Sequence, residues 1–450
     1  MRKTLFLGTI LFLIALGLRL LPLNYGLPNT FYYDEGRYVS QAVRVGSDGI
    51  RPASYTYGPL FPYAVAGSYG FVYSIGKASG QWLDSTEFQK QYFKDPSLFF
   101  GTARALSALF GALAATLLLT TGRRWLRLET GRVANSWENF LEPLKSSANL
   151  GPWLAAFSLA VFATAVSFGA QAKAESLLLL LIVLWLYGVG RYRQGSSLAI
   201  LSFAGICVGL ATATKYNAIL FLPWHALVPF LGSRFRKGST WLATLLAPVG
   251  GFFLGAPASI LDLQGLWQGI QFNSKISTGF SFADPTVWAS KMQSFAFEDL
   301  QGGLGPLLFL FALMGTWSVL RNRGRSGLWL VSLAWGFLAF HLFQDAPRLV
   351  PRYLLPAIPV FFILAGAGID SVLGATVHRF GSPPAFLRVA TVVLLLLPTL
   401  IGTVSWVTPV LGDDTRWQAQ VWIEKNIPSQ SAVLVEDPVA SPPLNPTGAA

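Results

Sequence analysis

The sequence predicts an all-α polytopic membrane protein with about 11 transmembrane helices and further helices in the membrane interface. Two features of its composition favour this class: 53% of the 450 residues are hydrophobic, and only 12% are charged. Soluble domains carry about 25% charged residues. The third observation is that the apolar residues gather in runs long enough to cross a bilayer. The mean hydropathy of +0.50 agrees with this assignment.

The apolar runs are counted against the roughly 20 residues of helix that a hydrocarbon core requires. The first run follows Arg2 and Lys3, and no small-residue cleavage site follows it, so we expect a retained signal anchor. The least regular part is 151–214, where three runs are joined by very short loops. The predicted spans are 4–22, 98–121, 151–169, 175–190, 198–214, 217–232, 240–257, 303–320, 327–344, 353–373 and 386–408.

Basic residues alternate from loop to loop along this pattern. If the N-terminus is inside, the inner loops hold pairs such as Arg123 with Arg124 and Arg234 with Arg236, whereas the short outer turns hold only Lys173, Lys215, Arg348 and Arg352. This is the positive-inside distribution of a cell-membrane protein. It also explains the net charge of +12 without nucleic acid as a partner.

The same topology places two long loops and the C-terminal tail outside. The loops are 23–97 and 258–302, and the tail, 412–450, follows a transmembrane domain of 1–411. The aromatic stretch that begins at Tyr55 contains Pro59 and Pro62, and we expect it to form an interfacial helix rather than a span. In the tail we expect an amphipathic helix, a short strand and a disordered end.

Cysteine and histidine give little indication of a cofactor. Cys207, the single cysteine, lies in an apolar run and is interpreted as a small hydrophobic residue. The three histidines have no metal-ligand spacing, so a zinc site is not expected. We therefore predict no cofactor, and the sequence leaves a requirement for a divalent metal open.

The stretch 31–45 carries the first candidate site. It places the adjacent carboxylates of Asp34 and Glu35 just beyond the first span, with Arg37 close behind. From Tyr38 onward the apolar residues recur at helical spacing, which predicts a short amphipathic helix along the membrane surface. The alternative is a solvated helix whose charges have no function.

Other ionisable residues fall at the outer ends of the predicted spans. Such residues are costly at a membrane and are functional candidates by default. For the basic ones the alternative is that the side chain reaches to lipid headgroups, and this alternative is favoured most for Lys173. The candidates are Arg104, Glu175, Lys215, Arg348, Arg352 and Tyr353.

These residue types suit one class of reaction. A carboxylate can take a proton from a hydroxyl, and Lys, Arg and Tyr side chains can hold a phosphate. Together, at the edge of a bilayer, they favour sugar transfer from a polyprenyl phosphate to an acceptor hydroxyl. A lipid or solute transporter would also use buried charges, but the chain shows no internal repeat. A non-catalytic assembly factor is the third alternative.

The chain also resembles the GT-C superfamily of membrane glycosyltransferases, in the branch of protein O-mannosyltransferases and lipid A aminoarabinose transferases. The resemblance covers residues 1 to about 435, and it depends on six markers in order rather than on any one of them. The markers are Asp34-Glu35, the aromatic-proline stretch 57–60, ARALSALFG at 103–111, QAKAESLLLL at 171–180, ATKYNAILFLP at 213–223 and PRYLLPAIP at 351–359.

The resemblance implies a role for each candidate residue. Asp34 matches the family's catalytic base, with Glu35 beside it, and Glu175 matches a second acidic position. The donor-phosphate contacts implied are Arg104, Lys215, Arg352 and Tyr353, while Arg37 and Tyr57 would line the loop and the acceptor. The implied partners are the lipid bilayer, a polyprenyl-phosphate-sugar donor, and an acceptor protein, lipid or glycan on the extracytoplasmic side.

Two departures from the family pattern affect this interpretation. Gly58-Pro59 stands where relatives often have a double proline, so the geometry of that loop is left open. Many relatives carry a larger outer soluble domain than the short tail found here. The sugar, the prenyl chain length and the acceptor do not follow from the sequence.

Overall fold

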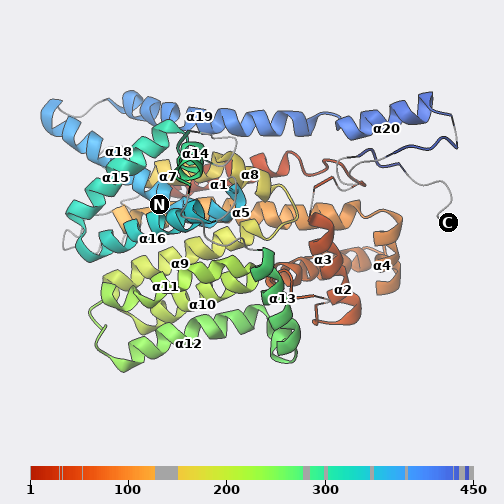
Figure 1. Ribbon diagram of the computed structural model, residues 1–450, viewed down its shortest axis with the longest axis horizontal. Coiled ribbons are helices and arrows are strands. Elements are labelled where there is room, and N and C mark those ends of the chain that lie inside the picture. The colour runs from red at the N-terminus through yellow and green to blue at the C-terminus, as the bar shows by residue number, and fades with distance from the viewer. Residues whose placement is uncertain are drawn as a thin grey trace.

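The computed structural model is helical throughout the part of the chain that it describes. That part comprises residues 2–29, 31–32, 34–52, 54–126, 150–276, 284–297, 303–344, 349–380, 384–428, 430–434 and 441–444. The longer helices extend along the long axis of the molecule, with α19 on one side and α9, α10 and α12 on the other (Figure 1). Their bounds are α1 Arg2–Leu20, α5 Ser97–Leu126, α9 Glu175–Gly195, α10 Leu198–Thr214, α12 Gly238–Gly255, α15 Pro306–Asn322, α16 Gly324–Phe343, α18 Ile358–Phe380 and α19 Ala385–Leu411.

Helix α5 lies at the centre of the bundle. It packs against α1, α7 and α9, while α10 packs between α9 and α12, and α18 packs against α15 and α7. Many of the buried side chains of α5 are alanines, so neighbouring helices can approach α5 closely. This central helix therefore connects the two ends of the molecule through one continuous element.

The structure supports a multi-pass protein but does not confirm eleven spans. Within the described residues, six helices are long and apolar enough to cross a membrane, or seven if one bent pair counts as a span. The predicted span 217–232 is instead divided into η2 Tyr216–Phe221, α11 Leu222–Ala226 and η3 Val228–Leu231. Pro223 and Pro229 lie within it, and a proline cannot supply the amide that a continuous helix needs there.

The bent pair consists of α7 Gly151–Val161 and α8 Ala163–Gly169, which meet at an angle of 50°. At such a break the last carbonyls of α7 lose their helical partners. Arg19, whose side chain is fully buried, donates hydrogen bonds to the carbonyls of Leu159 and Ala160 at 3.2 and 3.0 Å. Thr403 of α19 donates to the carbonyl of Val161. The carbonyls at the break thus accept hydrogen bonds from two other helices, as a low-dielectric interior requires.

The long segment between α1 and α5 forms three helices: α2 Glu35–Asp48, α3 Leu60–Ala78 and α4 Ser85–Lys94. They gather at one end of the bundle, on the right in Figure 1. Helix α2 buries Tyr38, Val39 and Ala42, which confirms the amphipathic pattern predicted for it. The expected interfacial helix is α3, which packs against α2 and α5.

The second long segment and the tail are also helical. Residues 258–302 contain α13 Leu263–Ile276 and α14 Pro285–Phe297 after the short helix η4 Pro257–Ile260, and α17 Pro351–Leu354 and η6 Leu355–Ala357 precede α18. In the tail, α20 Thr415–Asn426 confirms the expected helix. The strand expected after it does not form at 431–434, and the rest of that stretch, 435–440, lies outside the described residues.

Candidate functional site

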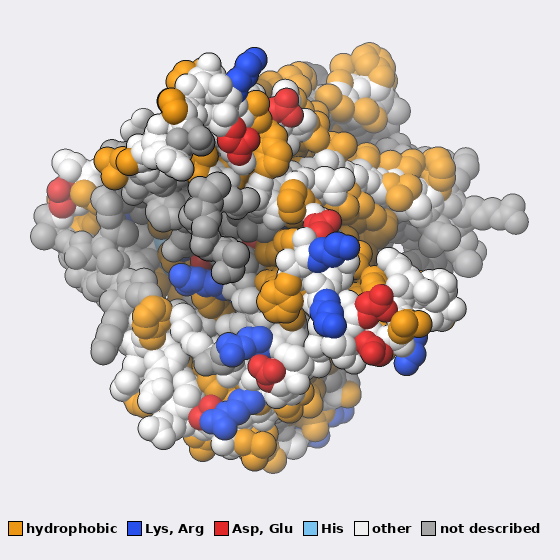
Figure 2. Space-filling model, turned by 90° about the vertical axis from the view of Figure 1, so that its right-hand side faces the viewer, with side chains coloured by type: hydrophobic (Ala, Val, Ile, Leu, Met, Phe, Trp, Pro, Cys, Tyr) orange, Lys and Arg blue, Asp and Glu red, His pale blue; other side chains and the backbone are white. Residues whose placement is uncertain are grey.

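Charged side chains from five elements meet at the end of the bundle that carries α2. Arg104 marks this end on α5, and Arg124 lies 20 residues further along the same helix, or about 30 Å at 1.5 Å per residue. That separation matches the thickness of a hydrocarbon core. Figure 2 looks onto the α2 end, where Lys and Arg side chains lie beside Asp and Glu side chains.

Glu35 and Arg104 form a fully buried, bidentate ion pair. The Arg104 Nε and Nη2 atoms donate to the two Glu35 carboxylate oxygens at 3.0 and 2.7 Å, and both side chains have no exposed surface. The backbone amide of Ala172 donates to Glu35 Oε1 at 2.7 Å. Arg104 Nη1 also donates to the carbonyls of Leu23 and Tyr25 at 2.8 Å. Glu35 therefore joins α2, α5 and the turn before α9, and its carboxylate is fully engaged.

Asp34 lies one residue earlier in a different environment. Its backbone is left-handed, with φ 73°, and its side chain makes no capping hydrogen bond to α2. Instead, Tyr57 Oη donates to Asp34 Oδ1 at 3.0 Å. Arg352 Nη1 lies 3.5 Å from Asp34 Oδ2, and the Arg352 side chain is 35% exposed. The Asp34 side chain is itself only 8% exposed, so it differs from Glu35 mainly in how loosely its carboxylate is bound.

Tyr57 connects Asp34 to a second arginine. Arg37 Nη1 donates to Tyr57 Oη at 2.9 Å, while that hydroxyl donates to Asp34. Burial and the nearby Asp34 carboxylate raise the pKa of Tyr57. The phenol therefore stays protonated at neutral pH and acts as a hydrogen-bond donor to Asp34.

Glu175 and Lys215 form the third ion pair of the site. Lys215 Nζ donates to Glu175 Oε1 at 2.8 Å, and the Glu175 side chain is only 4% exposed. Glu175 Oε2 has no hydrogen-bond partner within the described part of the chain. The centre of the Tyr353 ring lies close to two cations, 5.4 Å from Lys215 Nζ and 5.2 Å from the Arg352 guanidinium carbon.

Close backbone packing holds the loop that carries Tyr57. A Cβ on Gly58 would lie 2.3 Å from the carbonyl oxygen of Ala213, so only glycine fits this approach to the end of α10. Tyr216 Oη donates to the carbonyl of Tyr55, and Asn273 of α13 donates to the carbonyl of Thr56. Close packing against Ala213 therefore explains the glycine at position 58.

The structure brings all nine candidate residues into this one region. Arg348, the alternative phosphate contact, lies outside the described residues. Sequence reasoning undervalued Lys173, which is only 7% exposed and cannot reach lipid headgroups as an exposed lysine would. Its place two residues before Glu175 gave no indication of burial, which comes from the packing of its turn against Glu35 and α5.

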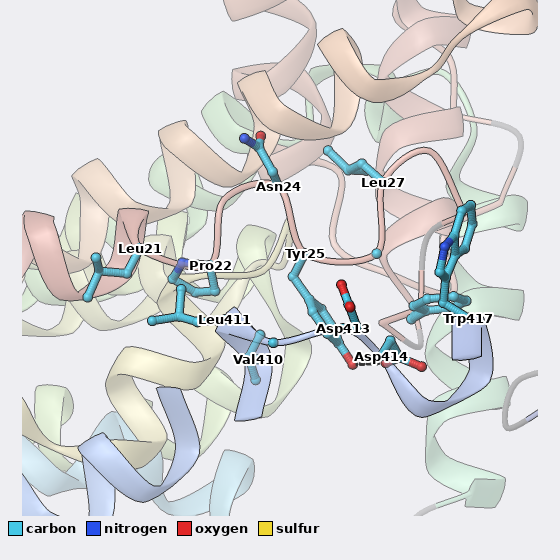
Figure 3. A pocket seen from close by; sticks show the side chains of 13 residues that line it. Leu21, Pro22, Asn24, Tyr25, Leu27, Val410, Leu411, Asp413, Asp414 and Trp417 are labelled. Atoms are coloured by element: carbon cyan, nitrogen blue, oxygen red, sulfur yellow. Dashed lines mark hydrogen bonds between the residues drawn. The ribbon is translucent and has the colours of Figure 1, made fainter. Parts of the chain in front are cut away.

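A cavity of about 310 Å³ lies next to this site (Figure 3). Leu21, Pro22 and Leu27 line it from the segment after α1, and Trp417 lines it from α20. Tyr25 donates a hydrogen bond to Asp414 across the cavity, and Arg416 donates to the same carboxylate at 2.8 Å. Because Arg104 binds the Tyr25 carbonyl, the cavity and the ion pairs share one loop.

Comparison with known proteins shows which fold this is. No protein-family model matches the chain, and no curated protein matches its sequence significantly. The fold is similar to the crystal structure of ArnT from Cupriavidus metallidurans bound to undecaprenyl phosphate, with a TM-score of 0.51 and 16% identity over 91% of this chain and 74% of that one.

It is also similar to the apo oligosaccharyltransferase of Archaeoglobus fulgidus, with a TM-score of 0.53 and 14% identity over 95% of this chain. The chain covers only 58% of that longer protein. At these identities the likeness concerns the fold alone, and it agrees with the resemblance found in the sequence.

Proposed function

We propose that this protein transfers a sugar from a polyprenyl-phosphate donor to an acceptor hydroxyl at the extracytoplasmic face of the cell membrane. The observation that carries the proposal is the cluster of three carboxylates and four buried or partly buried cations at one end of an apolar bundle. The cations Arg104, Lys173, Lys215 and Arg352 exceed the carboxylates Asp34, Glu35 and Glu175 by one positive charge. Such a site suits an anionic group at a membrane edge.

Asp34 is the base in this proposal. The acceptor oxygen attacks the anomeric carbon and its proton passes to an Asp34 oxygen. The bond from the sugar to the phosphate oxygen breaks, and its electrons leave with the lipid phosphate. Asp34 suits this role because its carboxylate accepts only Tyr57 at close range, whereas that of Glu35 is saturated.

Lys215, Arg352 and Tyr353 would hold the phosphate as it departs. They lie close together, since both cations are within 5.4 Å of the centre of the Tyr353 ring. Cations aimed at developing charge stabilise a transition state more than a ground state. The similar fold of a protein that binds undecaprenyl phosphate supports a lipid-linked donor. The prenyl chain would then lie between the apolar helices.

The far end of the bundle supports the proposed orientation. Arg193 donates to the Arg124 carbonyl and to Ser326, so two arginines from α9 and α5 meet about 30 Å from the site. A basic cytoplasmic face opposite the site agrees with the positive-inside rule. We retain the proposal of eleven spans with the N-terminus inside.

The test is an assay of the purified full chain in lipid nanodiscs with a panel of radiolabelled polyprenyl-phosphate sugars. We expect release or transfer of one sugar, and loss of that activity in Asp34→Asn but not in the exposed control Asp48→Asn. A transporter would give a different result: labelled lipid would cross the bilayer of proteoliposomes with its sugar still attached. That outcome, without sugar release, would refute the proposal.

A further inference from the structure

Among the described residues of the site, Lys173 is the one buried cation that has neither a carboxylate within 4 Å nor a role in the proposed chemistry. It lies in the turn between α8 and α9, and two hydrogen bonds hold the backbone of this turn in place. Ser107 Oγ of α5 donates to the Lys173 carbonyl at 2.8 Å, and the amide of Ala172 donates to Glu35 at 2.7 Å. The ammonium lies 5.5 Å from the centre of the Phe168 ring, and the residue is 7% exposed.

Its charge is not neutralised by an ion pair. Arg104, Lys215 and Arg352 each lie within 4 Å of a carboxylate, but no carboxylate among the described residues lies that close to Lys173 Nζ. Burial lowers the pKa of Lys173, and the more distant carboxylates of Glu175, Asp34 and Glu35 oppose that shift while Arg352 adds to it. An unpaired buried ammonium is unfavourable on its own. A ligand that supplies the missing anion would relieve this cost.

We propose that Lys173 binds the phosphate of the lipid-linked donor. The inference rests on the proposed function and adds a residue to it. Lys215 and Arg352 must share their charge with Glu175 and Asp34, whereas the three N–H donors of Lys173 have no such partner. The donor phosphate therefore meets one cation of a largely buried residue that, among the described residues, has no carboxylate within 4 Å.

The phosphate contribution can be isolated with a matched pair of lipids. A polyprenyl phosphate and the polyprenol of the same length differ only in the phosphate, so the ratio of their affinities measures the phosphate site alone. We expect Lys173→Met to weaken binding of the phosphate roughly tenfold to a hundredfold, as for the loss of a hydrogen bond to a charged group. Binding of the alcohol should stay unchanged. Lys77→Met, an exposed lysine on α3, serves as the control.

A structural role for Lys173 predicts a different outcome for stability. If the lysine mainly held the turn in place, Lys173→Met would lower the unfolding temperature. We expect that temperature to stay equal or to rise, because an unpaired buried charge has been removed. Lys173→Gln, which keeps a polar side chain, provides a second variant if the methionine protein does not fold.

The outcomes separate the inference from the proposed function. If the wild type binds phosphate and alcohol equally well, the proposed lipid-phosphate site is wrong. If the wild type prefers the phosphate, and Lys215→Met loses that preference while Lys173→Met keeps it, the inference about Lys173 is wrong and the proposed function stands. Loss of the preference in Lys173→Met, with the unfolding temperature maintained, supports both.

Discussion

Asp34 and Glu35 share a peptide bond, but their carboxylates lie in opposite surroundings. Glu35 has no exposed side-chain surface and accepts two bonds from Arg104 and one from the Ala172 amide. Asp34 accepts one hydrogen bond at 3.0 Å from Tyr57 and faces a half-exposed Arg352 at 3.5 Å. The first carboxylate is held by three elements, and the second is positioned by one phenol.

Two adjacent acidic residues can therefore serve different purposes, one as a structural ion pair and the other as a base. A buried ion pair is strongly destabilising to break, because the remaining partner is left as an uncompensated charge. A base must instead keep a lone pair available to the reacting proton. The left-handed backbone at Asp34, where aspartate and asparagine are tolerated better than most residues, turns its side chain away from the helix end. The pair Lys215–Glu175 is intermediate, since one glutamate oxygen is bound and the other is not.

The largest effect on stability is expected from Glu35→Gln. The variant keeps the shape of the side chain but leaves the Arg104 charge uncompensated, which costs about 3–5 kcal/mol. Thermal unfolding of the purified protein, read against the wild type, measures the loss. Arg104→Met should be comparably destabilising. An unfolding temperature for Glu35→Gln equal to that of the wild type would show that the pair does not hold the site together.

The second largest effect is expected for Lys215→Met, which should lower the affinity for the donor. Loss of a charge-assisted contact should weaken binding of a polyprenyl phosphate by about 1.5–3 kcal/mol. The variant also leaves Glu175 unpaired, so some stability should be lost as well. The double variant Lys215→Met with Glu175→Gln should recover the stability but not the affinity. If affinity also recovers, Lys215 acts only by neutralising Glu175.

A smaller effect, on turnover, is expected for Tyr57→Phe. The phenol donates to Asp34 and accepts from Arg37, and removing it costs about 1 kcal/mol in the positioning of the base. Turnover should fall by less than about tenfold, while donor affinity stays unchanged. A simultaneous loss of donor affinity would instead place Tyr57 at the phosphate.

The smallest effect is expected from Asp48→Asn. Arg44 and Asp48 form an ion pair on the same helix as Glu35, but both side chains are 59% exposed. Exposed pairs of this spacing contribute less than about 0.5 kcal/mol. Unfolding temperature and turnover should both equal those of the wild type, and a marked loss would mean that α2 as a whole tolerates no change of charge.

Much of this arrangement followed from the sequence because it depends on local periodicity. The buried face of α2 was predicted from the spacing of Tyr38, Val39 and Ala42, and α10 begins and ends at the predicted residues 198 and 214. The gathering of the candidates at one end followed from the positive-inside rule, which assigns loops to sides.

Other features depend on contacts that sequence patterns do not encode. At the break between α7 and α8, the free carbonyls accept hydrogen bonds from Arg19 of another helix, so the local sequence does not indicate the break. The prolines at 223 and 229 divide an apolar run that has the composition of a span. Lys173 has the sequence context of a headgroup-facing lysine, and only the packing of its turn against α5 and α2 buries it.

The central claim, that Asp34 is the base, is tested most directly by single-turnover sugar transfer in Asp34→Asn at saturating donor. Asparagine tolerates the left-handed backbone and keeps the side-chain shape, so the variant removes little besides the proton acceptor. We predict that the rate falls by roughly 10²–10⁴, with donor affinity and unfolding temperature near those of the wild type. Near-full turnover in Asp34→Asn, together with loss of turnover in Glu175→Gln at unchanged donor affinity, would contradict the account and make Glu175 the base.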